Sequence, residues 1–119
     1  MKKFLLAATM LAAISTPALA DMTIGWGGPI TGGSAAVGEQ NLNGVKQAIE
    51  DINAAGGILG EKLVLQVEDD AGDPKQAVSV ANRLAAAGAQ FVIGHQNSGA
   101  SIPASDLYAE NGMLQMTPP

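Results

Sequence analysis

The sequence predicts an α/β fold, a doubly wound parallel sheet with helices on both of its faces. Short apolar runs alternate with longer segments of helical period, in the order β-α-β-α-β-α-β. Each connection between successive strands is long enough to hold a helix, and such crossovers join parallel strands. Four strands and three helices make a small unit for this architecture, so we expect the chain to be a fragment of a larger domain.

The first 20 residues have the pattern of a secretory signal peptide. Lys2 and Lys3 precede an apolar run over residues 4–14, and Ala18-Leu19-Ala20 offers a small-residue cleavage site. The apolar run is shorter than the roughly 20 residues of a membrane-spanning helix. We therefore expect cleavage before Asp21 and export of a soluble segment of residues 21–119 to the periplasm. A retained, uncleaved anchor is the alternative.

The segment after residue 20 is acidic and has no cysteine. Removing Lys2 and Lys3 from the six basic residues of the chain leaves four, against eleven acidic ones, for a net charge of −7. Such a surface repels phosphate groups, so we expect no nucleic-acid partner. A disulfide is excluded, and stability must come from the apolar core.

The first expected strand and helix occupy residues 22–57. Residues 22–26 form an apolar run that ends in glycines, which is typical of a buried strand. From Gly38 onward, apolar residues recur with a period of 3.6 residues. The residues on this face are Leu42, Val45, Ile49 and Ile52. They predict an amphipathic helix that ends at Gly56-Gly57.

A second strand and a second helix follow. Residues 63–67 predict the strand, which runs into the acidic residues 68–70. Asp73 is a good N-cap, with Pro74 at the first helical position and Gln76 at the third. This arrangement predicts a helix that begins after Asp73 and ends near Gly88.

The last expected elements are a strand, a helix and a strand. Residues 91–94 predict the third strand. Ser101, followed by Ile102 and Pro103, predicts the N-cap of a third helix, which ends near Gly112. Residues 113–117 begin a fourth strand.

In such sheets, ligands bind beyond the carboxyl ends of the strands, where the strand order reverses. For the order 2-1-3-4, this crevice lies between residues 27–37 and residues 95–101, beside Pro118-Pro119. The glycines of the first loop would let a ligand approach the backbone. They serve alternatively as a simple turn. Gly33 stands where a phosphate-binding loop needs lysine, so we expect no nucleotide cofactor.

The loop after the third strand carries the candidate ligand-binding residues. Gln96, Asn97 and Ser98 place amide and hydroxyl groups ahead of the third helix, whose free N–H groups favour an anion. If Ser101 caps the helix, the hydroxyl of Ser98 stays free for a carboxylate. Alternatively, that hydroxyl bonds only within its own loop.

Other residues give no indication of catalysis or metal binding. His95 is the single histidine and has no nearby nucleophile pattern, so we expect no enzyme activity. Residues 68–70 and Asp73 lack the alternating pattern of calcium loops, so we interpret them as a solvated strand end and a helix cap and expect no metal. Trp26 either lines the crevice or lies in the core.

The segments "AIEDINAAGGI", "DPKQAV" and "PASDLYAENG" occur here in the order and at the spacing typical of leucine/isoleucine/valine-binding periplasmic receptors of ABC transporters, and the chain resembles that family from residue 21 to its end. The resemblance implies part of the N-terminal lobe of a type 1, Rossmann-like periplasmic binding protein. It also implies a receptor that closes on a free amino acid, such as leucine, isoleucine or valine, and delivers it to an ABC transporter permease. A periplasmic sensor of an amino acid or amide, built on the same lobe, is the alternative.

The resemblance also implies roles for particular residues. Ser98 matches a serine that holds the ligand carboxylate, and Pro119 matches a position whose carbonyl accepts from the ligand ammonium. Val37 stands where an aromatic side chain often lies near the ligand. Some members of the family have a disulfide at the positions of Gly72 and Asn97, which this chain lacks. Further ligand contacts of the family lie beyond Pro119, so the chain by itself is expected to bind weakly.

Overall fold

The computed structural model describes residues 20–118, so Pro119 and nearly all of the expected signal peptide lie outside the described residues. Within this range the order of elements is β1 (Met22–Gly28), α1 (Ala35–Ala54), β2 (Leu63–Asp69), α2 (Pro74–Ala86), β3 (Phe91–Gly94), α3 (Ser98–Glu110) and β4 (Leu114–Met116). The strands pair in parallel in the order β2-β1-β3-β4. The predicted fold class is therefore confirmed, and the strand order is the one for which the sequence analysis located the crevice.

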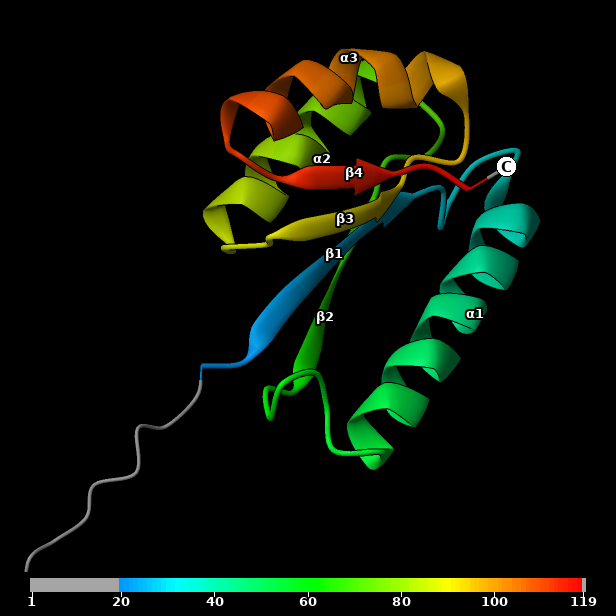
Figure 1. The fold of residues 1–119 in the computed structure, drawn as a ribbon. Coiled ribbons are helices and arrows are strands. Elements are labelled where there is room, and N and C mark those ends of the chain that lie inside the picture. The colour runs from blue at the N-terminus through cyan, green and yellow to red at the C-terminus, as the bar shows by residue number, and fades with distance from the viewer. Residues whose placement is uncertain (1–19, 119) are drawn as a thin grey trace, which may run out of the picture.

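The helices form two layers around this sheet. Helices α2 and α3 lie together on one face, and α1 lies on the other (Figure 1). Strand β1 is central. The next strand in the chain, β2, pairs with it on one side, and β3 pairs with it on the other side. The strand order thus reverses between β1 and β3, whose carboxyl ends meet where Gly27 pairs with Gly94. This is the point at which the sequence predicts a crevice.

The apolar core lies between the sheet and the helices α2 and α3. Helix α2 supplies a stripe at helical spacing, because Ala77, Val80, Ala81 and Leu84 are all buried. Small residues let these layers approach closely: a Cβ on Gly25 of β1 would lie only 3.0 Å from Cδ1 of Leu84. Tyr108 of α3 completes this cluster and is also fully buried.

The opposite face of the sheet is covered less closely. In α1 only Gly38 and Leu42 are buried, and the remaining apolar residues of its inner face are half-buried. An apolar groove of about 320 Å³ runs between α1 and the sheet. Polar contacts hold the end of the helix instead: the side chain of Asn53 donates to the Leu63 carbonyl and accepts from the Leu63 N–H, both at 2.8 Å.

The structure confirms one helix start and corrects another. Asp73 caps α2, and its side chain accepts from the N–H groups of Lys75 and Gln76. Helix α3, however, begins four residues earlier than expected, because Asn97 and not Ser101 is its N-cap and accepts from the Ala100 N–H at 3.1 Å. The prediction that Ser101 caps this helix is wrong. Its hydroxyl lies within the first turns and donates to the His95 carbonyl at 3.0 Å.

Candidate functional site

A groove of about 510 Å³ lies at the carboxyl ends of β3 and β4, against the start of α3. It is lined by His95, Gln96, Asn97, Ser98, Ser101, Ile102, Thr117 and Pro118. The structure thus brings together three of the five residues that the sequence analysis names as ligand-binding. Pro119 lies outside the described residues, but the two residues before it line the groove.

Ser98 is the first residue of α3 and is exposed. It therefore lies inside the first turn of the helix rather than in a free loop. The first N–H groups of a helix have no intrahelical partner and favour a negatively charged group. A carboxylate placed here would meet both these donors and the Ser98 hydroxyl.

The two amide side chains beside Ser98 already have partners within the chain. The side chain of Asn97 caps α3, and that of Gln96 accepts a hydrogen bond from Asn41 of α1. Asn97 also lies next to Gly72, where a Cβ would be 3.6 Å from the Asn97 amide nitrogen. These contacts fix the orientation of the loop after β3 relative to its neighbours.

Val37 does not line the groove. It lies in the first turn of α1 with 47% of its surface exposed, on the loop side of the sheet. Asn41, one turn further along α1, reaches Gln96, but Val37 itself is not among the residues that line the groove, so its predicted role stays a prediction.

Packing requires glycine at two positions at the end of β1. A Cβ on Gly27 would lie 2.8 Å from Cε1 of His95, and one on Gly28 would lie 2.7 Å from the ring of Trp26. Trp26 itself is only 2% exposed, so it belongs to the core and does not line the crevice. A Cβ on Gly33, by contrast, would meet nothing within 4 Å. Close packing within the fold accounts for Gly27 and Gly28.

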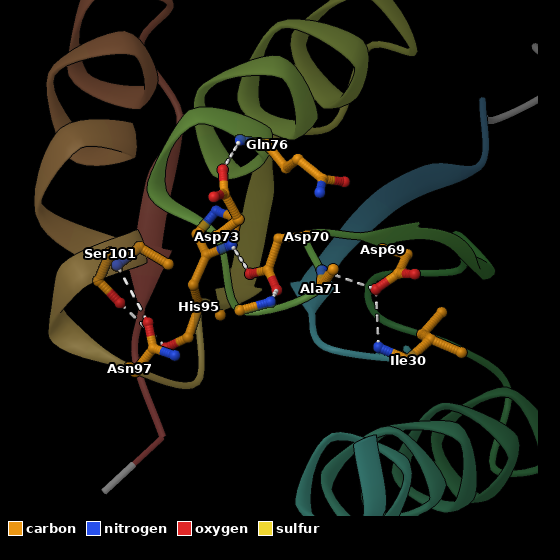
Figure 2. A network of polar contacts seen from close by, with 12 residues as sticks. Ile30, Asp69, Asp70, Ala71, Asp73, Gln76, His95, Asn97 and Ser101 are labelled. Carbon is orange, nitrogen blue, oxygen red and sulfur yellow. Dashed lines mark hydrogen bonds and ion pairs between the residues drawn. The ribbon is translucent and has the colours of Figure 1, made fainter. Parts of the chain in front are cut away.

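Asp69, at the end of β2, holds the loop that follows β1. Its carboxylate accepts from the N–H groups of Ile30 at 2.8 Å and Ala71 at 2.8 Å (Figure 2). It also accepts from the Thr31 hydroxyl at 2.6 Å. Burial by itself would raise the pKa of Asp69, but these hydrogen bonds and one from the Thr31 N–H together lower it below its ordinary value. Asp69 is therefore a structural anchor for one border of the crevice.

The next residue, Asp70, overturns the interpretation of the acidic run as a solvated strand end. Asp70 is 0% exposed, and its Oδ2 lies 2.5 Å from Nδ1 of His95 (Figure 2). The other ring nitrogen of His95 lies 2.9 Å from the Tyr108 hydroxyl. Sequence analysis missed this network, although one feature points to it: the glycine at position 27 leaves room for the His95 ring above β1.

Burial, and then the negative charge of Asp70, raise the pKa of Tyr108 far above its ordinary value. Its hydroxyl therefore keeps its proton as a hydrogen-bond donor. Among residues 20–118, no three His, Cys, Asp or Glu side chains gather as a metal site. Within the same residues, no helix has the length and apolar character to cross a membrane.

Comparisons with known proteins show which family the chain resembles. The profile of the family described as "Periplasmic binding protein" matches residues 21–119. The chain is 50% identical to the Leu/Ile/Val-binding protein homolog 1 of Brucella abortus, over 99% of this chain and 33% of the relative. It is 54% identical to an amino acid binding protein of Pseudomonas aeruginosa, over 95% of this chain and 30% of that protein. The chain thus spans about a third of the length of these curated relatives.

Solved structures share the same fold. A substrate binding protein of a branched-chain amino acid transporter from Streptococcus pneumoniae, in complex with isoleucine, superimposes with a TM-score of 0.79 at 28% identity, over 82% of this chain and 28% of that one. An ABC transporter substrate-binding protein from Desulfitobacterium hafniense, in complex with leucine, gives 0.72 at 34% identity over the same shares. With the family profile matched from residue 21 to residue 119, this chain belongs to the periplasmic binding protein family.

Proposed function

We propose that this chain is part of the N-terminal lobe of a receptor that captures a branched-chain or related amino acid in the periplasm and delivers it to an ABC transporter permease. The observation that carries the proposal is the groove at the carboxyl ends of β3 and β4, where polar residues meet the start of α3. The solved relatives in complex with isoleucine and leucine support the ligand class. The solved relatives are described as substrate-binding proteins of transporters, which favours a transport receptor over a sensor built on the same lobe.

Each candidate residue has a role in this proposal. The Ser98 hydroxyl and the first N–H groups of α3 hold the ligand carboxylate. Gln96 and Asn97 shape the loop that carries Ser98, and the carbonyl of Pro119 accepts from the ligand ammonium. Val37 lies near the ligand side chain only if the start of α1 borders the bound amino acid. Residues 1–20 act as a cleaved signal peptide, and residues 21–119 form the exported lobe segment.

The groove is a binding site without catalysis in this proposal. Both ring nitrogens of His95 are engaged, one by Asp70 and one by Tyr108, so the ring is not available as a base for a nucleophile. The similar proteins described above are binding proteins by name, in agreement with capture and release rather than reaction.

Calorimetry tests the proposal in two proteins. The 119-residue chain titrated with leucine, isoleucine or valine should show no binding tighter than about 1 mM, roughly −4 kcal/mol, because half of a closing cleft offers half of the polar partners. A chimera in which residues 21–119 replace the matching segment of the Brucella relative should bind at least one of these amino acids at least about tenfold more tightly.

The unmodified Brucella relative is the control for the chimera. If that relative binds leucine while the chimera folds, as circular dichroism reports, and binds none of the three amino acids, the proposed function is wrong. Micromolar binding by the 119-residue chain would instead show that part of one lobe is sufficient for capture.

A further inference from the structure

The buried network of Asp70, His95 and Tyr108 joins three separate elements of the fold. Asp70 follows β2, His95 follows β3, and Tyr108 belongs to the third turn of α3. All three side chains are almost completely buried, with exposed fractions of 0%, 1% and 1%. Polar groups at such depth are costly unless each one is hydrogen-bonded, and here the contacts at 2.5 Å and 2.9 Å engage both ring nitrogens.

The hydrogen bonds of this network run in one direction. The Asp70 carboxylate accepts from the Gly72 N–H through Oδ1, at 2.7 Å, and from His95 through Oδ2, so Nδ1 of His95 carries a hydrogen. The Tyr108 hydroxyl has His95 as its hydrogen-bond partner within residues 20–118, so it donates to Nε2. A ring that donated from Nε2 would leave the buried hydroxyl hydrogen without an acceptor.

His95 is anchored through its main chain as well as its side chain. Its carbonyl accepts from the Ser101 hydroxyl at 3.0 Å, and the preceding carbonyl, of Gly94, accepts from the Gln115 side chain at 2.9 Å. The residues that follow directly, 96–98, are among those that line the groove. The side-chain network and these main-chain bonds therefore both act on the residue that immediately precedes this segment.

We propose that Asp70, His95 and Tyr108 are positioning residues, whose directional hydrogen bonds hold residues 96–98 in the geometry that receives the ligand carboxylate. This inference rests on the proposed function for the identity of the ligand. An apolar trio of the same volume would fill the space without directional bonds. The network fixes the orientation of the His95 ring and joins it to α3 through Tyr108.

The first test is the hydrogen position on His95, measured by long-range proton–nitrogen NMR spectra of the 119-residue chain. We expect the hydrogen on Nδ1. In Asp70→Asn, the amide NH2 group donates to Nδ1 instead, so the hydrogen should move to Nε2. A hydrogen on Nε2 in the parent chain, or an unchanged tautomer in Asp70→Asn, would overturn the assigned directions of these hydrogen bonds.

The second test compares two variants of α3, each of which removes a different hydroxyl group. Tyr108→Phe keeps the ring but deprives Nε2 of its partner, while the control Ser105→Ala removes a hydroxyl that donates to the Ile102 carbonyl at 2.7 Å. Only Tyr108→Phe should shift the amide resonances of residues 96–98 in the 119-residue chain. In the Brucella chimera, Tyr108→Phe should weaken amino acid binding by about 2- to 30-fold, the range for residues that modulate a site without touching its ligand.

The outcomes separate the two proposals. If the Tyr108→Phe chimera binds as tightly as the parent chimera although it unfolds at a lower temperature, the network is structural only, and the positioning role is wrong while the proposed function stands. If the parent chimera binds no amino acid, the proposed function fails, and the amide resonances of residues 96–98 still decide the positioning role. Unshifted resonances in Tyr108→Phe would overturn it.

Discussion

The two faces of the sheet are covered in different ways. On one face, α2 and α3 pack small and medium apolar residues against β1 and β3, and the buried stripe of α2 is almost inaccessible to solvent. On the other face, α1 leaves an apolar groove and depends on polar contacts near its ends, such as those of Asn53 with Leu63. The comparison teaches that an amphipathic pattern defines a helix and its inner face, but does not determine how closely that face packs.

The largest expected effect is a core deletion on the closely packed face. Leu84→Ala removes a side chain that is 0% exposed, and should lower the free energy of unfolding by about 2–5 kcal/mol because a cavity remains. The matched change Ile49→Ala, on half-buried α1, should cost about 1 kcal/mol or less. Urea unfolding of both variants measures the difference. Equal losses would show that the two faces contribute alike.

A residue at the start of α3 should contribute more to ligand affinity than a residue at the start of α1. In the Brucella chimera, Ser98→Ala should remove a hydrogen bond to the ligand carboxylate, a loss of about 1.5–3 kcal/mol or roughly 10- to 150-fold in affinity. Val37→Ala should have a smaller effect, because Val37 does not line the groove. Calorimetry measures both affinities.

Ser101→Ala is the stability control for Ser98→Ala, since it removes the hydroxyl that donates to the His95 carbonyl. It should lower the melting temperature more than Ser98→Ala does. A Ser98→Ala chimera with unchanged affinity and a lowered melting temperature would identify Ser98 as a structural residue.

A smaller effect on stability is expected from the N-cap residues of α2 and α1. Asp73→Ala removes the side-chain acceptor for two N–H groups of α2, and should cost about 0.5–2 kcal/mol of stability. Ser34 stands at the same position before α1 but makes no cap hydrogen bond with its side chain. Ser34→Ala should therefore leave the thermal unfolding of the chain nearly unchanged. A clear loss in Ser34→Ala would indicate a cap that forms in solution.

The smallest effect concerns the pH dependence of stability through Asp69. Because the folded state lowers the pKa of Asp69 from 3.8, the carboxylate contributes stability above that value. This contribution should be lost progressively as the pH falls below about 4 and through the lower folded pKa. Acid titration monitored by circular dichroism should show a shallower decline for Asp69→Asn. Identical profiles would mean that Asp69 does not anchor the loop after β1.

Much of the fold follows from patterns that act over a few residues. The alternation of apolar runs and helical periods predicts each of the seven elements, and Asp73 with Pro74 predicts the start of α2 because cap and dihedral preferences are local. The edge of the sheet that holds the groove also follows from the sequence, since parallel strands direct their carboxyl ends to one edge. The predicted border of residues 27–37 does not line the groove, which lies against β3, β4 and α3. The family resemblance, confirmed by the matching profile, adds the ligand class of the proposal.

Other features are decided only when distant residues meet. Asn and Ser are both favoured as N-caps, so the residue types alone do not decide between Asn97 and the predicted Ser101. Ser101 lies within the helix in a fold where its hydroxyl bonds to the His95 carbonyl. Asp70 and His95 are 25 residues apart and come together because β2 and β3 both pair with β1, where Gly27 leaves space for the imidazole ring. The sequence by itself therefore determined the elements, their order and the edge of the sheet that holds the groove. The tertiary structure alone decided which carboxylates are buried and which residues hold the groove in place, because these contacts join strands and helices that local preferences do not relate.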